Sequence, residues 1–353
     1  MSKFCLLREP DAYTPLDWDL LVDESARAYW LDLFERNFEA TMVQAVRQYG
    51  RSAERRIGKA RRQFTDILSG LRQAPASLPS GRLDVLELNR IREKALYDNL
   101  LGAPYERVKQ QHIAESAELY PSVIRGLRGL ESFAKWEQLV RGVLVGNAFD
   151  LGGAPKDQTS SQPGDFLELL DDSHSRPWLV DDFDALACDL QVAPPAKWTK
   201  AVVFVDNSGA DFVLGVLPLA RELALAGVQI VLAANEKASL NDITADEAID
   251  VIEHLAGVDR DLEALIQGDM FQVVSTGTNL PVLDLAGVSD ELNEASADAD
   301  LVVLVGMGRA VETNFDAKFS VGSLRLAMLK NPMVADRLGG KFQDYVCKYV
   351  PVA

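Results

Sequence analysis

Apolar residues in the first part of the chain recur every three or four positions, which is the spacing of one buried helix face. Between residues 27 and 50, Trp30, Phe34, Phe38 and Met42 follow this spacing, and Gly50 ends the segment. The same pattern predicts four further helices, over residues 52–71, 83–100, 104–119 and 130–145. We therefore expect residues 1–146 to form a helical N-terminal region.

The pattern changes after residues 152–164, where Gly, Pro and Ser accumulate and predict a surface loop. Short, continuously apolar runs rich in β-branched residues then alternate with helical segments. The runs span residues 201–205, 228–233, 271–275 and 301–305, and the helical segments span 211–226, 244–256 and 289–297. Such runs are typical of strands buried on both faces of a parallel sheet. Residues 147–353 are therefore predicted to form a Rossmann-like, doubly wound α/β domain with its site at the carboxyl ends of the strands.

Polar side chains follow the first two of these strands. Asp206 and Asn207 come directly after the run 201–205, and Asp242 lies in the loop after the next strand. Thr244 and Glu247 form a capping-box pattern, so the following helix does not need Asp242 as its cap. Two carboxylates and an amide are suitable ligands for Mg²⁺ or Mn²⁺. Ordinary turn and capping chemistry remains the alternative for these residues.

Two glycines and an arginine follow the strand at 301–305. Gly306 and Gly308 could let backbone N–H groups approach a phosphate, with Arg309 and Lys318 binding its oxygens. The segment is not a dinucleotide fingerprint, because Val311 occupies the third glycine position, and this argues against a nicotinamide enzyme. The alternative is a tight strand-to-helix turn with a surface arginine.

Charge and composition narrow the choice of partners and location. Lys and Arg number 36 against 53 Asp and Glu, which gives a net charge of −17 that repels nucleic acid and anionic membranes. The basic run over residues 51–62 has no interleaved aromatic residues and is predicted to be an exposed helix face. The longest apolar run, residues 223–234, is too short to span a membrane. With few cysteines and no signal-peptide pattern, we expect a cytoplasmic protein.

Several segments resemble a known enzyme family. They are LNRIREKALYDN (88–99), LVRGVLVGNAFDLG (139–152), RPWLVDD (176–182), residues 201–244, LPVLDL (280–285) and DADLVVLVGMGRAVETN (298–314). Together they resemble the metal-dependent damage-control phosphatases, first catalogued as domain of unknown function 89. The similarity is closest to the subfamily of a stand-alone plant protein and the C-terminal domain of pantothenate kinase 4. The subfamily's EGMGR signature falls on residues 305–309, with Val305 in place of Glu.

The resemblance implies a helical part packed against an α/β domain and hydrolysis of phosphate monoesters. The implied substrates are damaged or surplus small metabolites, such as sugar phosphates or phosphopantetheine-related compounds. It also implies one divalent metal on Asp206, Asn207 and Asp242, which would be Mg²⁺ or Mn²⁺, with Co²⁺ or Ni²⁺ as further candidates. No nucleic-acid or membrane partner is implied, and the sequence does not indicate an oligomeric state.

We expect Arg309 and Lys318 to stabilise the phosphoryl oxygens, with Asn147 donating a further hydrogen bond. Asn147 could instead only cap the preceding helix. Asp211 and Asp242 are candidate bases, and either a water molecule or Asp206 could attack the phosphorus.

A further candidate pocket residue is Arg92, although an ion pair with Glu93 on the surface is its alternative role. Two other functions are also considered. A protein carboxyl methyltransferase is disfavoured because Gly209 is the only glycine in the loop after the first strand. A non-catalytic metal-binding scaffold is the other alternative, given the departure at Val305.

Overall fold

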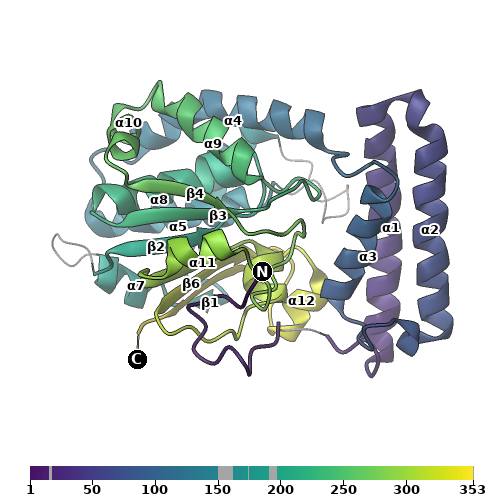
Figure 1. Ribbon diagram of the computed structural model, residues 1–353. Coiled ribbons are helices and arrows are strands. Elements are labelled where there is room, and N and C mark those ends of the chain that lie inside the picture. Colours follow the sequence, from purple (N-terminus) through teal and green to yellow (C-terminus); the bar gives the residue numbers. More distant parts are fainter. Residues whose placement is uncertain (16–17, 150–161, 174, 191–196, 353) are drawn as a thin grey trace.

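A seven-stranded sheet forms the centre of the computed structural model, which describes residues 1–15, 18–149, 162–173, 175–190 and 197–352 (Figure 1). The strand order is β1-β7-β6-β5-β2-β3-β4, and β2 to β6 run parallel, whereas β7 is antiparallel to β6. The bounds are β1 Val180–Asp181, β2 Lys200–Phe204, β3 Gln229–Ala234, β4 Phe271–Ser275, β5 Leu301–Val305, β6 Gly322–Met328 and β7 Tyr345–Val350. The predicted doubly wound, mostly parallel α/β sheet is confirmed.

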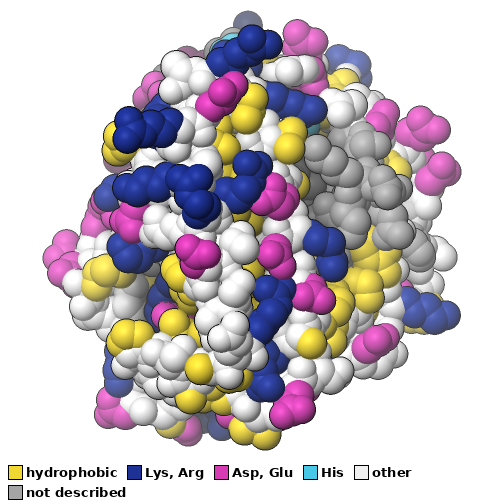
Figure 2. Space-filling view, turned by 90° about the vertical axis from the view of Figure 1, so that its right-hand side faces the viewer, with side chains coloured by type: hydrophobic (Ala, Val, Ile, Leu, Met, Phe, Trp, Pro, Cys, Tyr) yellow, Lys and Arg dark blue, Asp and Glu magenta, His cyan; other side chains and the backbone are white. Residues whose placement is uncertain are grey.

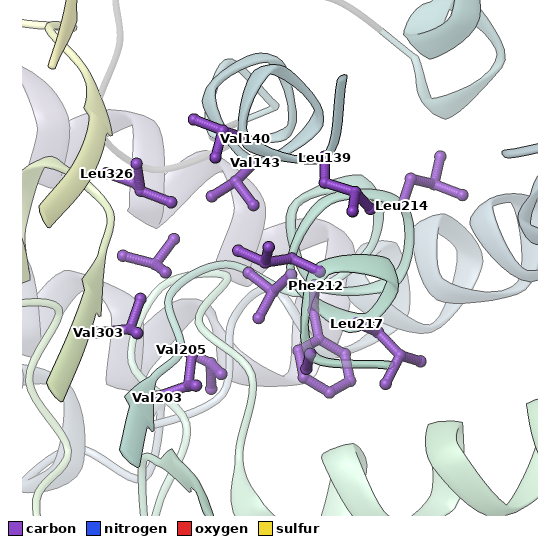
Figure 3. Packing of buried hydrophobic residues seen from close by; sticks show 14 of the residues in the cluster. Leu139, Val140, Val143, Val203, Val205, Phe212, Leu214, Leu217, Val303 and Leu326 are labelled. Atoms are coloured by element: carbon purple, nitrogen blue, oxygen red, sulfur yellow. The ribbon is translucent and has the colours of Figure 1, made fainter. Parts of the chain in front are cut away.

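Helices cover both faces of the sheet. One core unites one sheet face with α4 (Glu106–Gly126), α5 (Ser132–Gly146), α6 (Phe166–Asp172), α7 (Phe183–Leu190), α8 (Leu217–Leu225), α9 (Ala245–Ala256) and α10 (Arg260–Gln267). In Figure 3, Val143 of α5 and Phe212 lie close to Val203, Val303 and Leu326 of the strands. The alternate strand positions therefore face this helical layer, as expected for strands buried on both sides.

The opposite face belongs to a second core. Its helices are α1 (Glu24–Tyr49), α2 (Glu54–Gln73), α3 (Val85–Tyr97), α11 (Asp290–Ser296) and α12 (Pro332–Arg337). Helices α1 to α3 stand together at one end of the molecule (Figure 1), where the rings of Phe38 and Phe64 stack with centroids 4.1 Å apart. Helices α4 and α5 instead share their core with the sheet, and a domain boundary at residue 146 stays a prediction.

The predicted basic helix face lies on α2. Its arginines are mostly exposed and pair with acids of α1, as in Arg61–Glu39 and Arg72–Asp32, each at 2.8 Å. Figure 2 shows Lys and Arg side chains interspersed with Asp and Glu on this side of the molecule. In the described part of the chain, no helix combines the length and apolar character that crossing a membrane requires. Most of the predicted loop 152–164 lies outside the described residues.

The chain changes direction within the sheet between β2 and β5. From β2 it winds outward through β3 and β4, and it then returns to place β5 on the other side of β2. Such a switch point leaves a crevice beyond the carboxyl ends of the two strands. Two π-helical segments, Asp211–Val216 and Met307–Glu312, begin just after β2 and β5. Because π-helical turns are rare and occur often at functional sites, both observations point to this edge of the sheet.

Candidate active site

Asp206 lies at the centre of a buried polar cluster beyond the end of β2. Its Oδ2 atom accepts hydrogen bonds from the amide nitrogens of Asn207 at 2.9 Å and Asn147 at 3.0 Å, and its Oδ1 atom accepts one from Arg309. Its backbone carbonyl accepts from the N–H of Ile243, which joins the loop after β2 to the loop after β3. Both carboxylate oxygens are therefore fixed by neighbouring donors.

Asp211 holds the side chains of Asn147 and Asn207 in place. Its Oδ2 atom accepts from Asn147 Nδ2 at 3.0 Å and Asn207 Nδ2 at 2.9 Å, while Asp211 itself is fully buried. Burial and the neighbouring charge of Asp206 raise the pKa of Asp211 to about 6. The amide nitrogen of Asn207 faces the two carboxylates, and its side-chain oxygen, which accepts no hydrogen bond from the described residues, can act as a ligand.

Asn147 caps α5 and also binds two aspartates, a contact that was not predicted, while the predicted hydrogen bond to a phosphoryl oxygen stays a prediction. Its backbone N–H donates to Val143 O at 3.1 Å as the cap of α5, and its side chain binds the two aspartates. Its Oδ1 atom accepts from Met328 N at 3.2 Å, and its backbone carbonyl accepts from Lys330 Nζ at 2.9 Å. Asn147 therefore connects the end of α5 with the ends of β2 and β6.

Asp242 belongs to the same cluster through Arg309. The Oδ2 atom of Asp242 accepts from Arg309 at 2.7 Å and from Asn235 Nδ2 at 3.1 Å. Burial opposes the charge of Arg309, but the carboxylates of Asp242 and Asp206 outweigh it and raise the pKa of this guanidinium. Thr244 and Glu247 form the predicted capping box, so Asp242 is not the cap of α9.

Gly306 allows β5 to approach Asp206 closely. It has φ 91° and ψ 152°, and a Cβ atom at this position would lie 2.0 Å from Asp206 Oδ2. A Cβ at Gly308 would lie 2.3 Å from the carbonyl oxygen of Pro281. The two glycines are therefore required by packing around the cluster, in addition to any role in phosphate binding.

The donor set fits a hard divalent cation. Three buried carboxylates, Asp206, Asp211 and Asp242, are accompanied by two buried cations, Arg309 and Lys330, so the cluster carries a negative charge. The Oδ1 atom of Asp211 has no hydrogen-bond partner among the described residues. Among those residues, no three or more His, Cys, Asp or Glu side chains are arranged to hold a metal ion. The predicted ligand set contains only two carboxylates, and its third member is an amide, so it is not a group of that kind.

A pocket opens from this cluster toward α1 and α3. Asp206, Asn207, Asp242 and Gly308 line its inner end, together with Lys330. The outer wall comes largely from the helices and comprises Trp30, Leu33, Phe34, Asn37, Val85, Asn89 and Arg92. The pocket therefore joins the carboxyl edge of the sheet to the N-terminal helices.

One predicted cationic residue, Lys318, lies away from the pocket, whereas Arg92 lines it as predicted. Lys318 does not line the pocket; it lines hollows with Leu7 and Phe319, in the segment that leads into β6. Because β6 runs parallel to β5, the chain must return to the opposite edge of the sheet before β6 begins. Lys330, just after β6, lies in the pocket instead, and it was missed because β6 was not predicted. The alternative of a surface Arg92–Glu93 pair is wrong, since both side chains are at most 5% exposed.

Val305 lies in the apolar core beneath the cluster. It is fully buried in the same core as Val205 and Leu326, at the end of β5. The position at which the resemblance expects a glutamate is therefore filled by a hydrophobic side chain, while Gly306, Gly308 and Arg309 keep their places around the cluster.

Comparison with known proteins identifies the family. A family model described as the damage-control phosphatase ARMT1-like domain matches residues 45–346. A damage-control phosphatase of Arabidopsis thaliana is 40% identical over 300 residues, which cover 84% of this chain and 80% of that protein. The 4'-phosphopantetheine phosphatase of Mus musculus is 33% identical over 397 residues, covering 98% of this chain but 48% of that protein. Pantothenate kinase 2 of A. thaliana is 36% identical over 381 residues, with 99% and 42% covered.

The chain thus spans less than half the length of the last two relatives. A solved structure gives the same fold: the crystal structure of a DUF89 family protein from Pyrococcus horikoshii has a TM-score of 0.63 at 18% identity, covering 92% of this chain and 98% of that one. The family match and the similarity to the plant enzyme lead to one conclusion: the chain belongs to the damage-control phosphatases with an ARMT1-like domain.

Proposed function

We propose that this chain hydrolyses phosphate monoesters of small metabolites with a divalent cation held by Asp206, Asn207 and Asp242. The observation that carries the proposal is the buried, negatively charged cluster of carboxylate and amide oxygens at the inner end of the pocket. When bound, the cation polarises a phosphoryl oxygen and makes a water molecule easier to deprotonate. Mg²⁺ and Mn²⁺ suit the oxygen donors, and Co²⁺ or Ni²⁺ are further candidates.

The side chains that face the pocket favour Arg92 and Lys330 as the groups that bind phosphoryl oxygens. Both line the pocket, whereas Arg309 directs its guanidinium at Asp206, Asp242 and Asn235. We therefore assign Arg309 the task of holding the two carboxylates in position. Arg92 donates to Glu93 Oε1 from Nη2 at 2.8 Å and from Nε at 2.9 Å, and these two hydrogen bonds orient its guanidinium.

Water is favoured over Asp206 as the attacking group. A carboxylate that accepts bonds from two amides and a guanidinium is poorly nucleophilic, because these donors stabilise its negative charge. Asp242 lines the pocket and is the better candidate to accept the proton that the attacking water loses. Asp211 does not line it, and its contacts suit the positioning of Asn147 and Asn207.

The outer wall of the pocket is suited to the rest of the substrate. It combines apolar side chains with the amides of Asn37 and Asn89, so it can contact both carbon and hydroxyl or amide groups of a leaving group. Sugar phosphates and phosphopantetheine-related compounds are therefore the first candidates. The cytoplasm, where such metabolites occur, is the proposed location.

A carboxyl methyltransferase would need space for an adenosyl cofactor beside the loop after β2. The packing of that loop leaves little space there, which disfavours this function. Gly209 packs against α4 so closely that a Cβ there would lie 3.0 Å from the Cβ of His112.

The experiment that tests the proposal is phosphate release by chelator-treated protein, with Mg²⁺, Mn²⁺, Co²⁺ or Ni²⁺ added back singly. The substrates are p-nitrophenyl phosphate, several sugar phosphates and phosphopantetheine compounds. We expect release only with added metal, and none from Asp206→Ala. Asp250→Ala, an exposed site on α9, is the matched control and should keep the wild-type rate. No release with any metal would favour the scaffold alternative.

The attacking group is tested by an acid-quenched single turnover of a ³²P-labelled phosphate monoester. We expect all of the label in released phosphate and none bound to the protein at any time point. Transient ³²P on the protein that is absent from Asp206→Asn would show instead that Asp206 attacks the phosphorus.

A further inference from the structure

A second hollow, far from the carboxyl edge of the sheet, gathers positive charge. It lies beside the segment that leads into β6, next to the end of β7, and has a volume of about 300 Å³. Its charged lining comprises Arg8, Lys318, Arg325 and Lys348 against a single acid, Asp316. In a chain with a net charge of −17, such an excess of cations in one place needs a physical reason.

Arg325 is buried, and among the described residues no carboxylate forms a hydrogen bond or ion pair with it. It is 1% exposed, and its guanidinium donates to the carbonyl oxygens of Asn314 and Ala317 and to the hydroxyl of Ser323. These neutral acceptors occupy three of its five N–H groups, and the carboxylate of Asp316 offsets its charge only in part. Burial accordingly lowers the pKa of Arg325 to about 10.

Lys348 adds a second positive charge directly beside Arg325. The two residues are cross-strand partners in the antiparallel pair β6–β7, where like charges destabilise a sheet. Lys348 Nζ donates to the carbonyl of Phe315 at 2.7 Å and to Asp316 at 3.1 Å, but the Asp316 side chain is 69% exposed. Among the described residues, Asp316 is therefore the carboxylate in direct contact with this pair of cations, while Asp182 acts on Lys348 without a contact.

The other lining residues strengthen the attraction for an anion. Phe315, Phe319, Val350 and Pro351 supply apolar walls, which reduce the screening of charge by water. Arg8 and Lys318 lie at the exposed side, and the backbone N–H of Arg8 donates to the carbonyl of Lys318 at 2.9 Å. Cations thus face the hollow from the N-terminal segment, the segment before β6, and both strands.

We propose that this hollow is a binding site for a small oxyanion, with phosphate as the ligand that its cluster of guanidinium and ammonium groups favours. Phosphate oxygens accept hydrogen bonds from guanidinium and ammonium groups and would neutralise the Arg325–Lys348 pair. The site is separate from the pocket of the proposed phosphatase reaction, so it does not depend on that reaction being correct.

The test is equilibrium dialysis of radiolabelled inorganic phosphate against the full chain in EDTA, which removes metal that could bind phosphate in the active site. We expect saturable binding of one phosphate per chain. Arg8→Glu and Lys348→Gln should each weaken it about tenfold or more, as expected for loss of a charge-assisted contact. Lys341→Glu, an exposed lysine outside the hollow, makes the same charge change as Arg8→Glu and should leave the affinity unchanged.

Competition with glycerol phosphate distinguishes a site for the phosphoryl group of a metabolite from a site for free inorganic phosphate. Displacement of the label supports a site for the phosphoryl group of a metabolite, and failure to displace it supports a site for the free ion. Absence of saturable binding overturns the proposal. Equal affinity of Arg8→Glu, Lys348→Gln and wild type also overturns it, as does an equal loss in Lys341→Glu.

Discussion

Replacing Gly306 with alanine tests whether the close approach of β5 holds Asp206 in place. Gly306 has φ 91° and ψ 152°, a conformation that costs residues with a Cβ atom about 1–3 kcal/mol. The new methyl group would lie 2.0 Å from Asp206 Oδ2 and 2.2 Å from its Cγ, so the carboxylate must move. Overpacking of this kind adds about 1–3 kcal/mol. The free energy of unfolding should therefore fall by roughly 2–6 kcal/mol.

Gly227→Ala is the matched control. Gly227 has φ 94°, and a Cβ there would meet no atom of the described residues within 4 Å, so backbone strain is the main effect introduced. Urea unfolding should show the larger loss in Gly306→Ala, and phosphate release should fall about tenfold or more in that variant alone, because Asp206 loses its position. A Gly306→Ala protein as stable and as active as Gly227→Ala would refute the reasoning.

Three further predictions test other parts of the structure. Lys330→Met should lower kcat/KM for a phosphate monoester about tenfold or more, since it removes a buried cation from the pocket, while Lys318→Met should leave it unchanged. Val305→Glu should lower the free energy of unfolding by roughly 4 kcal/mol, because the new carboxyl would be buried. This figure corresponds to a rise of about 3 units in the pKa of that carboxyl. An unchanged urea midpoint would contradict the prediction. Thr244→Ala should cost about 1 kcal/mol in the same measurement through loss of the α9 cap, and no loss would show that the capping box is dispensable.

The strands that could be predicted are those whose apolar residues are continuous. β2, β3 and β5 are buried almost throughout, and their sequences show it. β6 was missed because Ser323 and Arg325 interrupt the apolar run, although the fold buries both side chains. β7 was missed for a similar reason at Lys348. Sequence patterns cannot show that a polar side chain will be covered by a distant segment.

The candidate site could be predicted only in part for the same reason, since sequence patterns do not show which distant segments meet. Asp206 and Asp242 could be placed together because parallel strands end at the same edge of a sheet, and the structure joins both to Arg309. Lys318 was misplaced and Lys330 overlooked because the strand between them was not recognised. The contact of Asn147 with Asp206 spans 59 positions in the chain and depends on how α5 packs, so the hydrophobic pattern of α5 could not reveal it.

The pocket divides its tasks between two parts of the chain. The groups suited to metal binding lie at strand ends around the switch point, where Asn147, Asn207 and Arg309 donate hydrogen bonds to Asp206. The wall that would contact the rest of the substrate comes from α1 and α3, which meet this edge from a separate group of helices. Since the carboxylates are fixed mainly by residues outside α1 to α3, changes in the helical wall at positions other than Arg92 can alter which metabolite fits without moving the reacting groups. Substrate preference within this family should therefore follow the side chains of α1 and α3 more closely than those of the strand ends.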